Sequence, residues 1–238
     1  MAGHSQYSNR KHRIAAQAQK KNKVYLQFRK LILKALKEKS ESNLRNAIYN
    51  AQKSSISKEK IDTLLKSGEK DKTNYEDIIY EGFGPHGIAF VMHISTDNRN
   101  RTAGEIRNIF TKKNCSLGES GSVSFLFNKK GMIKYETIDS EMKDKILDQV
   151  INIDNIEDIE IEDIGENIIL YCQVKDMHKL SELLYPHIGE YKEMRISWKA
   201  KEEIKINDIE QKDQVLNFID CLLENEDIMY LDTNYQSL

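Results

Sequence analysis

The stretch IEDIEIEDIGENIILYCQV, residues 156–174, decides the fold. Isoleucines alternate with acidic residues before Gly165, and a nearly continuous apolar run follows it. Alternation is typical of a half-buried strand, and a short apolar run between turn residues is typical of a buried one. We therefore expect two strands, at about 157–163 and 167–174, that turn around Gly165.

The segments on either side extend this hairpin into a larger α/β unit. Apolar spacing predicts a strand at Met132–Tyr135, helices over about 140–151 and 177–186, and a strand at 193–200. This β-α-β-β-α-β order is the ferredoxin-like pattern. Lys129-Lys130-Gly131 is interpreted as the turn that enters the unit.

A second α/β pattern lies before this unit and resumes after it. Val123, Phe125 and Phe127 alternate in a predicted strand at Ser122–Phe127. The other predicted elements are strands at Ile78–Tyr80 and Ile88–Ile94, a helix over 99–113, a helix at about 208–224 and a strand at Ile228–Leu231. The last helix and strand would complete the earlier β-β-α-β unit. We therefore predict that this earlier unit is a second domain, discontinuous in sequence, and that the ferredoxin-like unit is a third domain inserted into it.

The N-terminal part of the chain shows helical patterns only. Apolar residues from Val24 to Leu36 recur at helical spacing, which predicts a helix from about 17 to 37. Two more helices are expected, at about 41–53 and from the N-cap Ser57 to Gly68. Residues 1–16 contain few apolar side chains, and we expect a mobile basic arm there.

The predicted fold class is α+β, with an N-terminal three-helix bundle followed by two ferredoxin-like α/β domains. The predicted domains are 1–74 for the basic arm and bundle, 75–129 plus 203–238 for the middle domain, and 130–202 for the acidic ferredoxin-like domain.

Charge is distributed unevenly along the chain. Residues 1–73 hold 18 Lys and Arg against 6 Asp and Glu, a net charge of +12, and residues 74–238 hold 18 against 32, a net charge of −14. Residues 1–37 contain ten basic side chains and no acidic one. Such asymmetry favours a polyanion partner, and the alternative is a solvated helix surface. The predicted nucleic-acid contacts are Arg10, Lys11, Arg13, Lys20, Lys21, Lys23, Arg29 and Lys30, with Arg99 and Arg101 as a second anion site.

Two short motifs, one rich in glycine and one containing two arginines, could each form a ligand site or have a purely structural role. Gly82-Phe83-Gly84-Pro85-His86-Gly87 matches the G-x-G-x-x-G pattern, but β-type residues follow it, so a tight turn between strands is favoured over a dinucleotide site. Asp97-Asn98-Arg99-Asn100-Arg101-Thr102 lies where a strand gives way to a helix. An anion site at the helix N-terminus and simple capping with solvated arginines both remain open.

Composition and spacing exclude several classes of protein. Of 238 residues 39% are hydrophobic and 31% charged, and no run of about 18 apolar residues predicts a membrane span. Three distant cysteines form no disulfide framework or zinc spacing. No metal spacing of histidines and no nucleophile motif is present. No secretory signal is apparent either. We expect a cytoplasmic, non-enzymatic protein without catalytic or metal residues, cofactor, small-molecule substrate or membrane partner.

The acidic stretch 136–166 supports an alternative function. It holds twelve acidic residues and two lysines. A protein-interaction module that recruits a basic partner would use such a surface.

Several sequence blocks occur in one order from residue 1 to about 235. They are Met1-Ala2-Gly3-His4-Ser5, Lys11-His12-Arg13 with Ala15-Ala16, Tyr80–Pro85, Asp97–Thr102, and Leu117–Val123 ahead of Phe127–Gly131. Together they resemble the YebC/PmpR family of probable transcriptional regulatory proteins. The chain departs from the family pattern at Tyr7, usually Trp, and at His86, where glycine is common.

The resemblance implies a three-domain fold and a cytoplasmic, non-enzymatic role in gene expression. The family is described as DNA-binding transcriptional regulators. Its mitochondrial relatives look like translational activators for cytochrome oxidase subunit I, and bacterial relatives look like ribosome-associated factors that ease stalling at proline-rich stretches. Ribosomal RNA and promoter DNA both remain open as partners. No helix with base-reading side chains is evident, which slightly favours ribosomal RNA.

Overall fold

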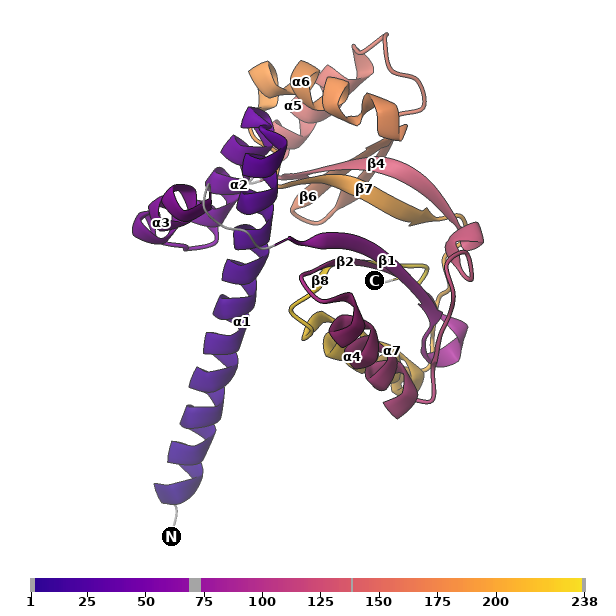
Figure 1. Cartoon of the computed structure of the whole chain (residues 1–238). Helices are drawn as coiled ribbons and strands as arrows, with labels where there is room; N and C mark the ends of the chain where they lie inside the picture. The colour runs from indigo at the N-terminus through magenta and orange to yellow at the C-terminus, as the bar shows by residue number, and fades with distance from the viewer. Residues whose placement is uncertain (1–2, 69–73, 138, 237–238) are drawn as a thin grey trace. The chain divides into compact units, whose positions relative to one another are not determined.

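The computed structural model describes residues 3–68, 74–137 and 139–236, with side chains from residue 21 onward (Figure 1). The chain forms two compact units, Met1–Tyr75 and Glu76–Leu238. Within the described ranges, no helix has both the length and the apolar character needed to cross a bilayer.

The first unit consists of three helices, α1 (Gly3–Glu38), α2 (Glu41–Lys53) and α3 (Lys58–Gly68). Ile32 of α1, Ala47 of α2 and Leu64 of α3 form the buried core between them. The side chain of Ser40 caps α2 by accepting a hydrogen bond from the backbone N–H of Asn43. The predicted α2 and α3 are therefore confirmed.

Helix α1 begins much earlier than predicted. It starts at Gly3 rather than near residue 17, so residues 3–16, where the sequence predicts a mobile arm, are helical. Residues 10–30 contain neither Gly nor Pro and are rich in Ala, Gln, Lys and Arg, which have high helix propensity. Once the packed C-terminal part of a helix has formed, adding each further residue needs no new nucleus.

The first sheet of the second unit combines early and late segments of the chain. Its order is β3-β1-β2-β8, with antiparallel neighbours throughout. The strands are β1 (Glu76–Phe83), β2 (Ala89–Thr96), β3 (Ser116–Leu117) and β8 (Ile228–Thr233). Helices α4 (Arg99–Lys112) and α7 (Ile209–Leu223) cover one face (Figure 1). There, the ring of Phe218 lies edge-on to Phe90 and Phe110, with centroids 5.2 and 5.0 Å away.

The motif Gly82–Gly87 is a turn between antiparallel strands, as predicted. After β1 comes a short 3₁₀ helix, η1 (Pro85–Gly87), and then β2, with Gly84 N–H donating to the carbonyl oxygen of Ile88 at 2.8 Å. His86 has a φ of +57° and Gly87 a φ of +75°. A left-handed backbone at residue 86 explains why glycine fits the family pattern there.

Gly84 allows the turn to lie against the aromatic core. A Cβ atom at this position would meet the Phe90 ring and would lie 2.8 Å from Cε1 of Phe218. We expect Gly84→Ala to lower the free energy of unfolding by about 1–3 kcal/mol, because neither ring can move without repacking the core. Urea unfolding measures this loss.

Gly104 provides the matched control for this substitution. It lies inside α4, and a Cβ there would have no neighbour within 4 Å. Gly104→Ala should raise stability by about 1 kcal/mol through helix propensity. Equal changes in the free energy of unfolding for Gly84→Ala and Gly104→Ala would contradict the packing argument.

The second sheet has the order β5-β6-β4-β7, again with antiparallel neighbours. Its strands are β4 (Phe127–Glu136), β5 (Glu160–Ile164), β6 (Asn167–Cys172) and β7 (Glu193–Ala200). Helices α5 (Ser140–Ile151) and α6 (Met177–Ile188) cover one face (Figure 1). Buried Ile133, Tyr135, Ile146, Leu170 and Leu184 pack between sheet and helices. The predicted β-α-β-β-α-β order and the α+β fold class are confirmed.

Two local predictions near this sheet are wrong, and one predicted helix is two residues longer than expected. Ser122–Phe127 is no strand, because Ser124–Leu126 forms a 3₁₀ helix, η2, and the two-residue β3 pairs with β1 instead. Lys129-Lys130-Gly131 is no turn, because β4 runs through it. Helix α6 continues past Pro186 to Ile188.

The division of the second unit into two domains is our proposal. The predicted boundary between residues 129 and 130 would cut β4, which begins at Phe127. We therefore propose a boundary at 126/127 and keep the predicted one at 202/203, so that each sheet belongs to one domain. Below, the residues 76–126 with 203–236 are called the second domain, and 127–202 the third.

Candidate nucleic-acid interface

The basic positions of the first unit lie along α1. Arg10, Lys11, Arg13 and Lys20 belong to this helix, and their side chains are outside the described part of the structure. Lys21 is exposed and Lys23 is half-buried. A helix of 36 residues is about 54 Å long. The helix therefore presents a long series of positive charges that no acidic side chain interrupts before Glu38.

Two of the predicted contacts gather around Tyr75, the last residue of the first unit. Arg29 Nη1 donates to the Tyr75 hydroxyl at 2.6 Å, and Lys30 Nζ lies 5.5 Å from the ring centroid. Lys30 is only 7% exposed. Of the predicted phosphate contacts whose side chains the structure describes, Lys30 is therefore the least accessible to a ligand.

The predicted second anion site has a different geometry. Asn98 caps α4, since its side-chain oxygen accepts from the backbone N–H of Arg101 at 3.1 Å. Arg101 Nη2 lies 2.7 Å from Asp227 and 3.0 Å from Asp97. The hydrogen bond that Arg101 donates to Asp227 raises the pKa of the Arg101 guanidinium. Arg101 is thus engaged by carboxylates of its own chain, and the capping interpretation fits this residue better, while Arg99 is exposed.

Asp227 joins the start of α4 to the segment before β8. Its Oδ2 accepts hydrogen bonds from Thr102 at 2.7 Å and from Thr96 at 3.1 Å, in addition to Arg101. Thr96 and Thr102 are fully buried. The polar block Asp97–Thr102 therefore stabilises the second domain.

Family models match nearly the whole chain. One described as the TACO1/YebC protein N-terminal domain matches residues 5–71, and one described as the TACO1/YebC second and third domain matches residues 75–235. The chain belongs to the TACO1/YebC family. The resemblance inferred from the sequence blocks is therefore confirmed.

TACO1/YebC relatives from several bacteria align over the full length. A protein of Wolbachia pipientis wMel is 37% identical over 99% of this chain and 98% of its own. One of Ehrlichia chaffeensis is 38% identical over 99% of both chains. Both carry the name probable transcriptional regulatory protein.

A solved structure has the same fold as this TACO1/YebC chain. The crystal structure of the conserved hypothetical protein Aq1575 from Aquifex aeolicus superposes with a TM-score of 0.75 and 28% sequence identity. The match covers 90% of each chain.

Glu81 of this TACO1/YebC chain holds the loop that carries its Gly-Ser-rich block. It is 3% exposed and lies in β1. Its carboxylate accepts hydrogen bonds from the backbone N–H groups of Gly121, Val123 and Ser124 at 2.8–2.9 Å. Burial raises the pKa of Glu81, but these hydrogen bonds outweigh burial and leave the pKa lowered. No local pattern in the sequence marks Glu81, because its partners lie about 40 positions further along the chain.

Asp232 connects the second and third domains of the TACO1/YebC fold. It is 7% exposed on β8, and Arg195 of β7 donates to both its carboxylate oxygens at 2.6 and 2.9 Å. His93 Nε2, the Ser197 hydroxyl and the backbone N–H of Trp198 also lie within hydrogen-bond distance. His93 is therefore a half-buried histidine with a carboxylate as its hydrogen-bond partner.

The negative charge of strand β5 is largely compensated by lysines of the third domain. Glu160 pairs with Lys130 and Lys199, Glu162 pairs with Lys199, and Asp163 pairs with Lys143. These ion pairs leave less negative charge for a basic partner than the sequence indicates, which weakens the interaction-module alternative.

Among the residues whose side chains the structure describes, no group of three or more His, Cys, Asp or Glu has the arrangement of a metal site.

Proposed function

We propose that this TACO1/YebC protein is a non-enzymatic, nucleic-acid-binding regulator of gene expression that acts in the cytoplasm. The observation that carries the proposal is α1, a continuous 36-residue helix with ten Lys and Arg side chains and no acidic one before Glu38. Phosphate backbones attract such series of charges independently of base sequence. The names of the relatives, probable transcriptional regulatory proteins, agree with a regulatory role.

The contrast in charge between the parts of the chain supports the same proposal. The net charge of −14 over residues 74–238 repels a polyanion, while the +12 over residues 1–73 attracts it. Like-charge repulsion of this kind favours one orientation of encounter. In our proposal, Arg10, Lys11, Arg13, Lys20, Lys21, Lys23 and Arg29 contact phosphates.

The partner we favour is ribosomal RNA, with promoter DNA as the second candidate. Lysine-rich contacts to phosphates position a protein but specify no base sequence. A translation factor that eases stalling needs affinity for the ribosome rather than for one operator.

The first test reverses the charge at three neighbouring positions of α1. Lys20→Glu/Lys21→Glu/Lys23→Glu should weaken binding to every RNA and DNA sequence by about tenfold or more near 0.1 M salt, because each lost phosphate contact removes a salt-dependent contribution. Fluorescence anisotropy with labelled oligonucleotides measures the affinity.

A matched control carries the same change in net charge elsewhere. Lys112→Glu/Lys145→Glu/Lys212→Glu alters lysines of α4, α5 and α7, outside the first unit. It should bind within about twofold of the wild type if net charge alone has little effect. Unchanged affinity of the α1 variant would overturn the proposal.

Sedimentation separates the two candidate partners. In sucrose gradients of cell lysate, a ribosome-bound factor comigrates with ribosomal fractions and is released by high salt. Protein that stays at the top of the gradient at low salt would favour promoter DNA.

A further inference from the structure

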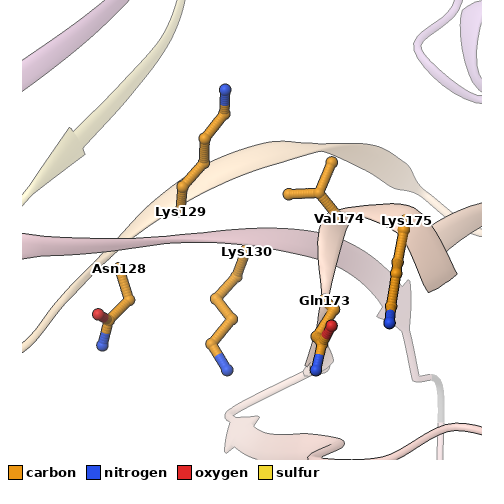
Figure 2. Close-up of a pocket in the computed structure, with 6 residues that line it drawn as sticks. All are labelled: Asn128, Lys129, Lys130, Gln173, Val174 and Lys175. Atoms are coloured by element: carbon orange, nitrogen blue, oxygen red, sulfur yellow. The ribbon is translucent and has the colours of Figure 1, made fainter.

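An open depression of about 480 Å³ lies on the third domain, outside the interface described above. Its lining residues are Asn128, Lys129, Lys130, Gln173, Val174 and Lys175. The first three belong to β4 and the others to the segment between β6 and α6 (Figure 2). The lining therefore includes three ammonium groups and two amides, which are hydrogen-bond donors, and no lining side chain is a carboxylate.

Most of these side chains extend in the same direction. Figure 2 shows Asn128, Lys130, Gln173 and Lys175 extending to the same side, with Lys129 and Val174 on the other. The amides and ammonium groups on that side can thus converge on one ligand.

The depression is positively charged although the domain around it is acidic. Lys129 and Lys175 are exposed, and no ion pair involves either of them among the described residues. Lys130 Nζ lies 2.9 Å from Glu160, but Lys199 pairs with the same carboxylate at 2.7 Å. Two acidic side chains of β5 thus face Lys130 and Lys199, which leaves the charge of Lys175 without a carboxylate partner among the described residues. Lys129, on the other side, lies with its Nζ 5.8 Å from the centroid of the Trp198 ring.

Close packing fixes the two halves of the depression relative to each other. A Cβ atom on Gly131 would lie 2.7 Å from the Cβ of Met177 and 3.4 Å from Sγ of Cys172. The first residue of α6 therefore packs directly on β4, which places residues 173–175 beside residues 128–130. The motif interpreted as a turn in the sequence is instead the place where glycine permits this contact.

We propose that this depression binds phosphate groups of a nucleic-acid strand. Ammonium and amide donors without an opposing carboxylate on the lining are the chemistry that recognises phosphate. An open depression lets a strand run across it, whereas small ligands are mostly enclosed by their pockets. The inference rests on the proposed function and deepens it, because it adds a phosphate contact in the third domain to those of α1. Two contacts in one chain bind a long strand more tightly than either contact alone.

The test compares two double variants of the full chain. Lys130→Gln/Lys175→Gln removes both ammonium groups on the lined side of the depression. Lys112→Gln/Lys145→Gln removes two exposed lysines of α4 and α5 and serves as the control with equal net charge. Binding of a labelled single-stranded RNA is measured by anisotropy across a salt series.

We expect the first variant to bind about three- to tenfold more weakly near 0.1 M salt. The slope of log affinity against log salt should become shallower by about 1.4, since each phosphate contact on a single strand contributes about 0.7. The control should keep the wild-type slope. In the wild type, NMR amide shifts on adding RNA should include residues 128–131 and 173–175.

Each other outcome overturns the proposal in a distinguishable way. Equal affinity and slope for wild type and both variants would overturn the depression as a site while α1 remains supported. Equal losses of RNA affinity in both double variants would show that the change in net charge alone weakens binding. If inorganic phosphate shifts the same amides with the same affinity as RNA, the site belongs to a free ion. No binding by the wild type would overturn the proposed function itself.

Discussion

Replacing Asp232 by alanine is expected to lower the free energy of unfolding by about 3–5 kcal/mol. The carboxylate is 7% exposed and accepts two hydrogen bonds from Arg195. The Arg195 side chain is itself 13% exposed, so the substitution leaves a buried guanidinium with Glu193 as its remaining carboxylate partner. His93, Ser197 and the Trp198 N–H would lose their acceptor as well.

Urea unfolding with a matched aspartate measures this effect. Asp213→Ala removes an exposed carboxylate from α7 and should change stability by less than about 0.5 kcal/mol. Asp232→Asn keeps the shape and one acceptor oxygen, so its loss should fall between those of the two alanine variants. A loss for Asp232→Ala no larger than that of the control would contradict the buried network.

The second large effect is expected at Glu81. Glu81→Ala leaves the backbone N–H groups of Gly121, Val123 and Ser124 without their acceptor. An unsatisfied buried donor costs about 1–3 kcal/mol, and two of these three groups are partly exposed and can bind water, so we expect a total loss of about 3 kcal/mol. Thermal unfolding measures the loss, and limited proteolysis should show faster cleavage between residues 118 and 124.

Glu119→Ala is the control for this substitution. Glu119 lies in the same loop and is exposed, so its removal should leave both stability and cleavage nearly unchanged. Cleavage of the loop at the wild-type rate in Glu81→Ala would refute the role of the carboxylate.

The pKa of Glu81 predicts the direction of the pH dependence. Because its pKa is lowered in the folded protein, the carboxylate contributes stability above its ordinary pKa of 4.5. This contribution is lost as the pH falls through the folded-state pKa. The difference in stability between wild type and Glu81→Gln should therefore shrink below about pH 4.5 and be full at neutral pH.

Much of the architecture follows from local patterns. Helices α2, α4, α5 and α7 have apolar residues at helical spacing. The strand before Gly165 shows alternation and the strand after it is a short apolar run, so local patterns suffice to predict these elements. The order of these elements is enough to predict that a late strand joins the early sheet.

Other features depend on partners far away in the chain. Val123 and Phe127 are buried, but Phe125 is 62% exposed, because Glu81 takes the N–H groups that a strand would use. Alternation alone therefore predicted a strand at Ser122–Phe127 where a 3₁₀ helix lies. Gly131 is predicted to lie in a turn, but in the structure the absence of a side chain there allows Met177 to pack closely on β4.

The candidate interface also combines features that the local sequence predicts with features that depend on distant partners. The positive charge of α1 is visible in the sequence, since no acidic residue interrupts it. The pairing of Arg101 with Asp227 spans 126 positions, so no local sequence pattern predicts it. The lysines of the depression come from segments about 45 positions apart, and only the pairing of β4 with β6 brings them together.

The late arrival of β8 has a consequence for how the protein folds during its own synthesis. Strand β2 ends at Thr96 and its neighbour β8 begins at Ile228, so the ribosome must add more than 130 residues before they can pair. At about 5–20 residues per second this takes roughly 7–26 s. Throughout that interval β2 is an open, apolar sheet edge, a form of strand that is prone to pair with other chains. All four strands of the other sheet are synthesised within it, so the third domain can fold first, while the second waits for the last residues of the chain.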